Sequence, residues 1–458
     1  MSGLDSLKVR VNLLKARLNP EPKQNVNSFH DEENSFIRFI KRWDVEILIA
    51  AITIVTIACR LFMLRFVSDD YTDYLSNWYQ QYYFEGFRAL GRQIGDYTPA
   101  YNYFLYLISL LRIAPGSTFR FLSMTLNPVN CLIKLFSSLF DFGIGIQIYF
   151  IVKKLTGSRI RGAIGYAITD MGLTVICNSA LWGQCDSIYG FFAILCIWFV
   201  LEDRPGLSWL SFSISFAFKL QAVFILPALL VLWLRGKTQI RYVVYVPLVY
   251  LIFALPAAIA GGVSGAGFLN RLGEVFKIYN NQSGSNTNAT NNAGTFLALI
   301  YKNYAGGKGI CTFSLVFAFV LNILLALYLI RFRAPLKDGT VIKIFLLFSM
   351  TVPYFLPHMH ERYFYLADLI MGIYVFMHPK RVILWIVQLF NSFTGYAIYL
   401  WDLPLLGFGV RQHWDTSGGA NGLSLRISSA LYLLAIGYVV YDLFKEEIEE
   451  EKRFAIEA

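Results

Sequence analysis

The chain has 458 residues, of which 56% are hydrophobic and only 15% are charged. Soluble domains usually carry about 25% charged residues, so this composition indicates a membrane protein. The net charge of +10 would suit a nucleic-acid-binding protein, but the basic residues stand in short clusters between apolar runs. We therefore expect a lipid bilayer around the chain and no nucleic-acid partner.

The N-terminal segment, residues 1–43, is polar and carries no cleavable signal, so we expect it on the cytoplasmic side. Leu7, Val11, Leu14 and Leu18 form a helical stripe within it. This pattern predicts either a basic amphipathic helix on the membrane surface or a solvated basic tail.

Apolar runs along the rest of the chain predict an all-α polytopic membrane protein of about twelve transmembrane helices. The basic cluster at 153–161 belongs on the cytoplasmic side, and treating 101–113 as a full span would move it outside. We therefore interpret 101–113 as an interfacial or re-entrant helix and place both termini in the cytoplasm. The expected spans are 44–65, 129–152, 162–178, 187–201, 207–218, 222–234, 242–261, 309–331, 342–356, 363–377, 382–400 and 425–444.

These spans divide the chain into four parts. After the basic segment come a transmembrane module at 44–380, C-terminal transmembrane helices at 381–444 and a cytoplasmic acidic tail at 445–458. The module carries two large extracytoplasmic loops, 66–128 and 262–308. We expect interfacial helices in the first loop, and a polar, mobile loop in the second, where Asn, Ser and Gly dominate 280–292.

Polar motifs stand at the extracytoplasmic ends of the expected helices. The SDDY motif of the first loop places Asp69 and Asp70 side by side, which suits a general base, or else a solvated pair of carboxylates. In GDYTPAY, Asp96 either faces a ligand or caps the following helix. Trp78 and Tyr97 of the same loop suit anchors at the membrane interface.

Later motifs add cations, amides and a further carboxylate. Lys134 either meets an anion or snorkels, and Asp141 is too far along the same helix to pair with it, so it is expected to hold a neighbouring helix. The remaining candidates are Gln184 and Asp186 in NSALWGQCDSIY, Lys219 and Gln221 in FKLQA, and His358, His360 and Arg362 in LPHMHERYFY.

Arg362 suits a phosphate through its planar fork of donors, although a structural pair with Glu361 is the alternative. The HxH pattern lacks a third ligand, so we expect no metal. Cys177 and Cys185 flank one short loop, and we favour free thiols over a disulfide. Because all these motifs share one side of the membrane, a common pocket is the simplest explanation.

The motifs resemble a family of membrane enzymes. SDDY, followed by NWYQQYYFEGFRAL and GDYTPAY, resembles the first extracytoplasmic loop of GT-C superfamily glycosyltransferases, especially the bacterial proteins related to the GPI mannosyltransferases. KLFSSLFD, WGQCDSIY, FAFKLQAVFILP and HMHERYFY are similar to later motifs of that set. FKLQ is also similar to the FKQ segment of the dolichyl-phosphate-glucose-dependent glucosyltransferases. The resemblance covers roughly residues 55–370.

The resemblance implies an inverting transfer of one hexose, with mannose suggested by the eukaryotic relatives, from a polyprenyl-phosphate carrier to a hydroxyl of a glycan or lipid-linked glycan. The base of that family corresponds to Asp70, and Asp69 stands where the family often has a small residue. No cofactor or metal is implied. The donor phosphate would meet Arg362, Lys134, Lys219 and His360, with Arg60 and Arg65 as further candidates. The sugar or acceptor would meet Asp96, Gln184, Asp186, Gln221, His358, Trp78 and Tyr97.

We expect a multi-pass protein of a bacterial plasma membrane with an extracytoplasmic active site. The main alternative is a transporter or flippase for lipid-linked sugars, which would place its ionisable groups near mid-bilayer and expose them to both sides. A lipid-linked polymerase or ligase is a further alternative.

Overall fold

A computed structural model describes residues 28–285, 287–301, 306–401, 403 and 420–457. The chain divides into two units, residues 1–50 and 51–458, which we describe separately. The described part of the first unit belongs to helix α2 (Ser28–Met63), which is kinked at Trp43. The expected amphipathic stripe from Leu7 to Leu18 lies outside the described residues.

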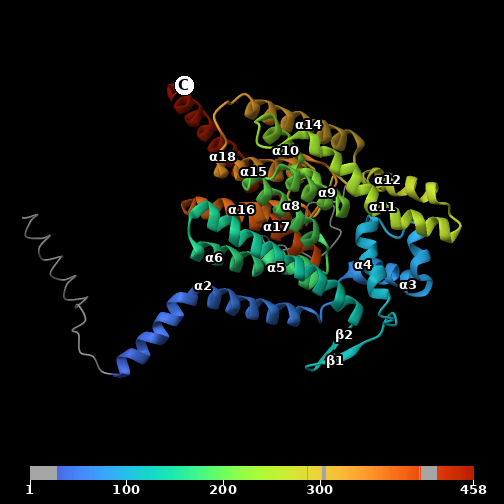
Figure 1. The fold of residues 1–458 in the computed structure, drawn as a ribbon. Helices are drawn as coiled ribbons and strands as arrows, with labels where there is room; N and C mark the ends of the chain where they lie inside the picture. The colour runs from blue at the N-terminus through green and yellow to red at the C-terminus, as the bar shows by residue number, and fades with distance from the viewer. Residues whose placement is uncertain (1–27, 286, 302–305, 402, 404–419, 458) are drawn as a thin grey trace, which may run out of the picture. The chain divides into compact units, whose positions relative to one another are not determined.

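The second unit is a bundle of helices with two short strand pairs (Figure 1). Among the described residues, 7 helices are long and apolar enough to cross a membrane, and the pair Arg159–Asp170 and Leu173–Trp182, bent by 43°, gives an eighth. Shorter apolar helices cover Asp186–Leu201, Leu220–Leu234 and Tyr365–Met377. The prediction of a multi-pass helical membrane protein is confirmed, although fewer helices than the expected twelve have full length.

Most expected spans coincide with a helix to within a few residues. Helix α5 shows why: Asn127 caps its start by accepting from the amide of Asn130 at 3.0 Å, Pro128 occupies its first turn, and Gly157 ends it with φ of 69°. The other helices of the bundle are α6 (Arg159–Asp170), α7 (Leu173–Ile176), α8 (Asp186–Leu201), α9 (Pro205–Phe218), α10 (Leu226–Leu234), α11 (Tyr245–Ser264), α14 (Lys308–Ile330), α15 (Asp338–Phe355), α16 (Tyr365–Met377), α17 (Val382–Trp401) and α18 (Ala420–Glu457). Single turns of 3-10 or π helix join several of them: η3 (Cys177–Trp182), η4 (Leu220–Ile225), η5 (Ile240–Val244) and η6 (Pro379–Arg381).

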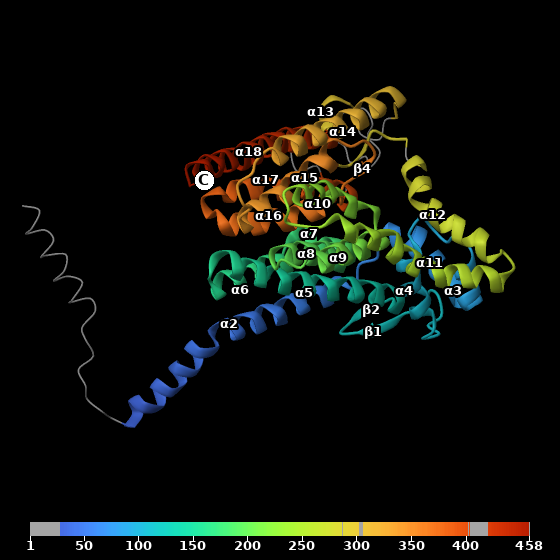
Figure 2. The ribbon, with the colours of Figure 1, turned by 45° about the horizontal axis from the view of Figure 1, so that its top comes forward.

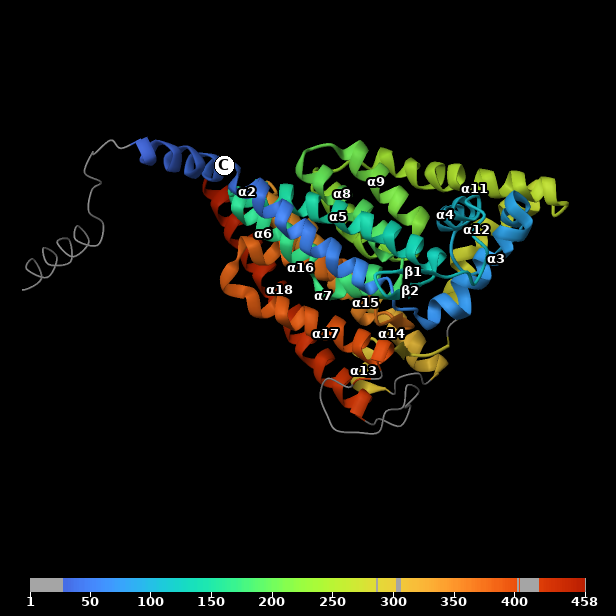
Figure 3. The ribbon, with the colours of Figure 1, turned by 90° about the horizontal axis from the view of Figure 1, so that it is seen from below.

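The helices differ in how much protein surrounds them. In the most apolar stretch of α15, 83% of the residues are buried inside the protein, whereas the share is only 22% in α14. Helix α15 is therefore a central helix, and α14 presents most of its apolar side chains outward, as a lipid-facing helix does. Helices α17 and α18 pack side by side, with α13 (Phe296–Ile300) beside the start of α18 (Figure 3).

The first loop is folded around its own apolar cluster, which includes Tyr71, Tyr79, Tyr82 and Tyr101. The interfacial helix expected at 101–113 is present as α4 (Pro99–Ser109). A hairpin of β1 (Phe119–Phe121) and β2 (Met124–Leu126) was not expected. The remaining elements of this loop are η1 (Tyr71–Leu75), α3 (Ser76–Glu85) and η2 (Gly86–Gly91).

The second loop differs from the polar loop expected there. Helix α12 (Phe268–Ser285) runs into the Asn-rich stretch, because Val275 and Ile278 bury one of its faces in a cluster shared with α9 and α11. Beyond it, β3 (Thr290–Asn291) pairs in parallel with β4 (Met359–His360). This strand pair ties the second loop to the HMHE motif.

The basic loops gather around the end of α18. Arg235 pairs with Glu447 at 3.1 Å, Lys337 with Glu450 at 2.6 Å, and Lys343 with Asp442 at 2.6 Å. Helices α3, α4 and α12 of the two large loops lie toward the other end of the bundle, and so does β4 (Figure 2). The end of α18 and the helices of the two large loops therefore lie at opposite ends of the bundle.

Candidate active site

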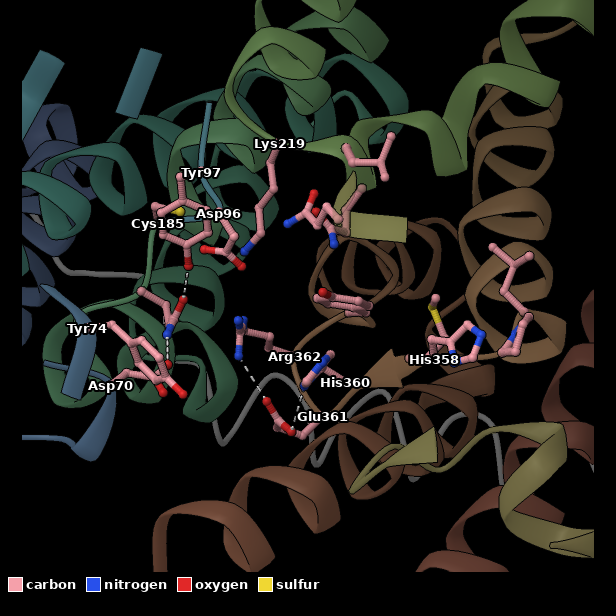
Figure 4. A pocket seen from close by; sticks show the side chains of 18 of the residues that line it. Asp70, Tyr74, Asp96, Tyr97, Cys185, Lys219, His358, His360, Glu361 and Arg362 are labelled. Carbon is pink, nitrogen blue, oxygen red and sulfur yellow. Dashed lines mark hydrogen bonds and ion pairs between the residues drawn. The ribbon is translucent and has the colours of Figure 1, made fainter. Parts of the chain in front are cut away.

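One cavity of about 1470 Å³ collects residues from both large loops and from several helix ends (Figure 4). Its walls come from the segments 69–101, 183–185, 219–224, 306–315 and 356–363, together with Tyr399. The expectation of a common pocket holds for most of the candidates. Those that line it are Asp69, Asp70, Trp78, Asp96, Tyr97, Gln184, Lys219, Gln221, His358, His360 and Arg362.

Lys134 does not line the cavity. Its ammonium group donates to the main-chain carbonyls of Met63 at 3.1 Å and Phe66 at 2.5 Å. The first carbonyl belongs to the last residue of α2 and the second lies three residues beyond it, so the helix dipole adds to the attraction for this cation. The structure therefore assigns Lys134 to fixing this end of α2, and not to the donor phosphate or to snorkelling.

Asp186 also lies behind the wall and not on it. Its carboxylate is fully buried and accepts from Lys219 Nζ and, at 2.8 Å, from Asn178 Nδ2. The Nε atom of Arg362 lies 3.7 Å from the same carboxylate. Asp186 is thus a shared counter-ion that holds two cations at the cavity, and no surface remains for the expected contact with a sugar.

The Asp70 carboxylate on the cavity wall accepts three hydrogen bonds from side chains. Its Oδ2 accepts from Trp182 Nε1 at 2.9 Å and from Gln184 Nε2, and its Oδ1 accepts from Tyr399 Oη at 2.7 Å. Three donors therefore fix the position of this carboxylate on the cavity wall. Tyr97 donates to Gln184 Oε1 at 3.0 Å, which fixes the orientation of that amide.

The neighbouring Asp69 has no such surroundings. Its side chain is exposed, and no hydrogen bond or ion pair joins its carboxylate to the described residues. Two adjacent residues on one turn point in different directions, so only one of them can face the three donors. Asp70, and not Asp69, is therefore the carboxylate that the surrounding donors hold on the cavity wall.

Arg362 brings a permanent positive charge to the cavity. Its guanidinium lies 5.1 Å from the centre of the Trp182 ring and donates to Glu361 at 3.1 Å. Burial by itself would lower the pKa of Arg362, but the nearby Tyr97, Glu361 and Asp70 raise it well above its usual range. The pair with Glu361 expected as an alternative is therefore present, and it does not remove Arg362 from the cavity.

The HMHE segment is pinned in an unusual backbone conformation. His358 has φ of 65°, its amide donates to the carbonyl of Ala289 at 2.9 Å, and its Nδ1 lies 2.5 Å from the carbonyl of Asn288. A carbonyl only accepts, so Nδ1 carries the proton. Burial would raise the pKa of Glu361, yet the hydrogen bond from His360 and the charges of His360 and Arg362 lower it. Backbone strain of this kind is often found at binding sites.

The first loop supplies an aromatic wall. The rings of Trp78 and Tyr97 meet edge to face at 5.5 Å, and Tyr101 meets Tyr97 at 5.0 Å. Gly95 has φ of 67°, and a Cβ there would lie 2.3 Å from the Trp78 ring, so only glycine fits. The N-cap of α4 is Thr98, so the helix-capping alternative for Asp96 is wrong.

The other polar groups singled out from the sequence have structural partners. Arg60 lies 3.1 Å from Asp141, which also accepts from Ser179 and, at 3.3 Å, from Tyr365, so Asp141 does hold neighbouring helices. Arg65 stacks on Phe62 at 3.9 Å. All 6 cysteines are free thiols, and no three His, Cys, Asp or Glu side chains within the described ranges could hold a metal ion.

Two contributors to the site were not identified from the sequence. The motif NSALWGQCDSIY contains Trp182, to which the sequence assigned no role, and Tyr399 lies in a part of the chain where the sequence suggested no site residue. No protein-family model matches the chain, and no curated protein is significantly similar to it. The site thus combines a positioned carboxylate, the buried cation of Lys219, the half-buried cation of Arg362 and an aromatic wall around one cavity.

Proposed function

We propose that this chain is a GT-C type membrane glycosyltransferase that moves one hexose from a polyprenyl-phosphate carrier to an acceptor hydroxyl with inversion. The acceptor would be a glycan or a lipid-linked glycan. The observation that carries the proposal is Asp70, which three donors hold on the wall of a cavity that also contains Arg362 and Lys219. A base and fixed cations in one site are what this reaction needs.

In the proposed reaction Asp70 accepts the proton of the acceptor hydroxyl. The hydroxyl oxygen forms a bond to the anomeric carbon of the sugar from the face opposite the phosphate. The bond between that carbon and the phosphate oxygen breaks, and its electron pair stays on the phosphate. Each turnover therefore leaves a glycosylated acceptor, a free polyprenyl phosphate and one proton on the base.

Arg362 and Lys219 would stabilise the charge that develops on the leaving phosphate. Trp182 supports this assignment because it contacts both the proposed base and one of the proposed cations. Its indole N–H donates to Asp70, and Arg362 lies over its ring. The base and one phosphate-binding cation are thus fixed by a single rigid side chain. Arg362 can bind two phosphate oxygens at once through its planar fork.

The aromatic wall formed by Trp78 and Tyr97 would bind the sugar, since aromatic faces stack on the apolar faces of sugar rings. Asp96, Gln221, His358 and His360 line the same cavity and offer hydrogen bonds to sugar or acceptor hydroxyls. Lys134 and Asp186, which the structure does not place on the wall, are left out of this assignment.

The proposal also fixes the placement in the membrane. The 7 long helices, the bent pair and the short helices α8, α9, α10 and α16 would together make about twelve spans. The basic loops around α18 would be cytoplasmic, both termini with them, and the cavity extracytoplasmic. We place the protein in a bacterial plasma membrane, with 44–380 as its catalytic module.

The test is a single-turnover assay with purified protein and a panel of polyprenyl-phosphate sugars. We expect wild type to consume one of these donors and release polyprenyl phosphate. Asp70→Asn should bind that donor but lose roughly 10²–10⁴ in rate, the usual contribution of a general base. Asp69→Asn is the matched comparison and should lose far less, because no donor holds its carboxylate.

Other outcomes would change the assignment. If Asp69→Asn were inactive and Asp70→Asn active, the base would move by one residue. One observation favours a flippase: Arg60, Asp141 and Asp170 form a buried charged cluster within the helices. Movement of lipid-linked sugar across liposomes without donor consumption would replace the enzyme by a transporter.

A further inference from the structure

The two oxygens of the Asp70 carboxylate are unequally occupied. Oδ2 accepts two hydrogen bonds, from Trp182 and Gln184, whereas Oδ1 accepts one, from the hydroxyl of Tyr399 at 2.7 Å. Each carboxylate oxygen offers two lone-pair sites. The site that these three donors leave is therefore on Oδ1, beside Tyr399.

Tyr399 is held so that its hydroxyl cannot easily turn away. Its ring stacks on Trp182 with 4.5 Å between centroids and 22° between planes. Tyr396, one turn earlier on α17, packs edge-on against Trp182 with 5.6 Å between ring centroids. Stacking fixes the plane of the phenol ring, and the hydroxyl lies in that plane.

We infer that Tyr399 is the positioning residue of the base, and that it directs Oδ1 of Asp70 to take the acceptor proton. This inference rests on the proposed function, in which Asp70 is the base. The Tyr399 hydroxyl donates to Oδ1 and occupies one of its lone pairs, and the other lone pair faces the acceptor. Hydrogen bonds donated to a carboxylate stabilise its ionised form in general, so altering this one donor tests the assignment through the pH profile.

Other charged groups also act on this carboxylate. Arg362 and Glu361 approach from the 356–364 loop, Asp69 and Asp73 stand on the same segment as Asp70, and Lys219 lies in the same cavity, paired with Asp186. All of them remain when only the Tyr399 hydroxyl is removed or altered. A change in the pH profile of such a variant therefore reports one hydrogen bond.

The experiment measures donor consumption against pH for wild type, for Tyr399→Phe, and for protein carrying 3-fluorotyrosine in place of Tyr399. Tyr399→Phe removes a donor, so the acid limb of the profile should move to higher pH by about one unit. Fluorine makes the phenol a stronger donor, so the acid limb should move the other way. Donor KM should change less than about twofold in both, since Tyr399 is not assigned to the donor.

Tyr354→Phe is the matched control. Tyr354 lies on α15, outside the cavity, and its buried hydroxyl forms a hydrogen bond with Ser429 of α18 at 3.1 Å. The pH profile of this variant should be that of wild type. If the acid limb stays in place in both Tyr399 proteins while wild type is active, the inference is overturned and the proposed function stands. If wild type consumes no donor, the proposed function fails and the inference falls with it.

Discussion

Single side chains in the cavity make several contacts at once, and Arg362 is the clearest case. Its guanidinium stacks over Trp182, donates to Glu361 and lies 3.7 Å from Asp186. Its Nε has no hydrogen-bond partner among the described residues although it is buried. A buried donor of this kind is costly to leave unpaired, and the polar group nearest to it is the Asp186 carboxylate behind the wall.

The contacts of Arg362 lead to a prediction about binding of the sugar donor. Arg362→Lys keeps the charge but loses the planar fork, so the KM for the donor should rise about tenfold while the pH profile keeps its position. Steady-state kinetics at saturating acceptor measure this. Arg235→Lys is the control: it also alters a buried arginine, but one paired with Glu447 near the end of α18, so it should lower stability without changing the KM. An unchanged KM in Arg362→Lys would remove Arg362 from the donor site.

At the scale of the elements, the start of α5 connects a helix end to the base. Asn127 caps α5, and the same side-chain oxygen accepts from the hydroxyl of Tyr71 at 2.9 Å. Tyr71 follows Asp70 directly. A single cap therefore fixes both the beginning of a long helix and the segment that carries the base.

This arrangement predicts that Asn127→Ala has two effects. Loss of the cap should cost about 1 kcal/mol of stability, and loss of the Tyr71 contact should lower the turnover rate severalfold. Ser158→Ala removes the equivalent cap of α6, where Ser158 accepts from the Arg161 amide at 3.2 Å. It should cost similar stability and leave turnover unchanged. Unfolding midpoints and donor consumption measure both, and equal turnover in the two variants would contradict the link.

At the scale of the whole molecule, the second unit keeps its two kinds of charge cluster apart. The cavity gathers Asp70, Arg362 and Lys219 near the folded parts of the large loops. The end of α18 gathers acidic side chains against the basic loops, as in the pair of Arg235 and Glu447. The acidic segment expected to be a tail is thus helical and paired with the loops.

These ion pairs are buried to different extents, so we expect unequal contributions to the free energy of unfolding. Glu447→Ala leaves the buried Arg235 with only the carbonyls of Leu329 and Ala334, and should cost about 3 kcal/mol. Glu450→Ala breaks a pair whose Lys337 side chain is 59% exposed, and should cost less than about 1 kcal/mol. Unfolding measured at low and high salt checks both. Turnover per folded molecule should stay at the wild-type level, and a loss in Glu447→Ala would show coupling between the two clusters.

The sequence by itself determined the features that depend on neighbours along the chain. Apolar runs and basic clusters predicted the membrane helices and their alternation, and residues such as Asn127, Pro128 and Gly157 mark the ends of α5 locally. Polar motifs at helix ends predicted one pocket. Two features were not predicted from local patterns. These are α12, inside a loop expected to be polar, and the strand pair that joins Asn291 to His360.

Only the tertiary structure decided which groups do what in the site. Asp69 and Asp70 have the same side chain, but that of Asp70 meets three donors whereas that of Asp69 is exposed. Lys134 differs from the other cations because its ammonium group donates to the carbonyls of Met63 and Phe66 at the end of α2. Tyr399 reaches Asp70 across 329 positions of the chain, a hydrogen bond that only helix packing can create. Burial and helix ends follow from residues close together in the sequence, whereas contacts between side chains follow from how the helices meet.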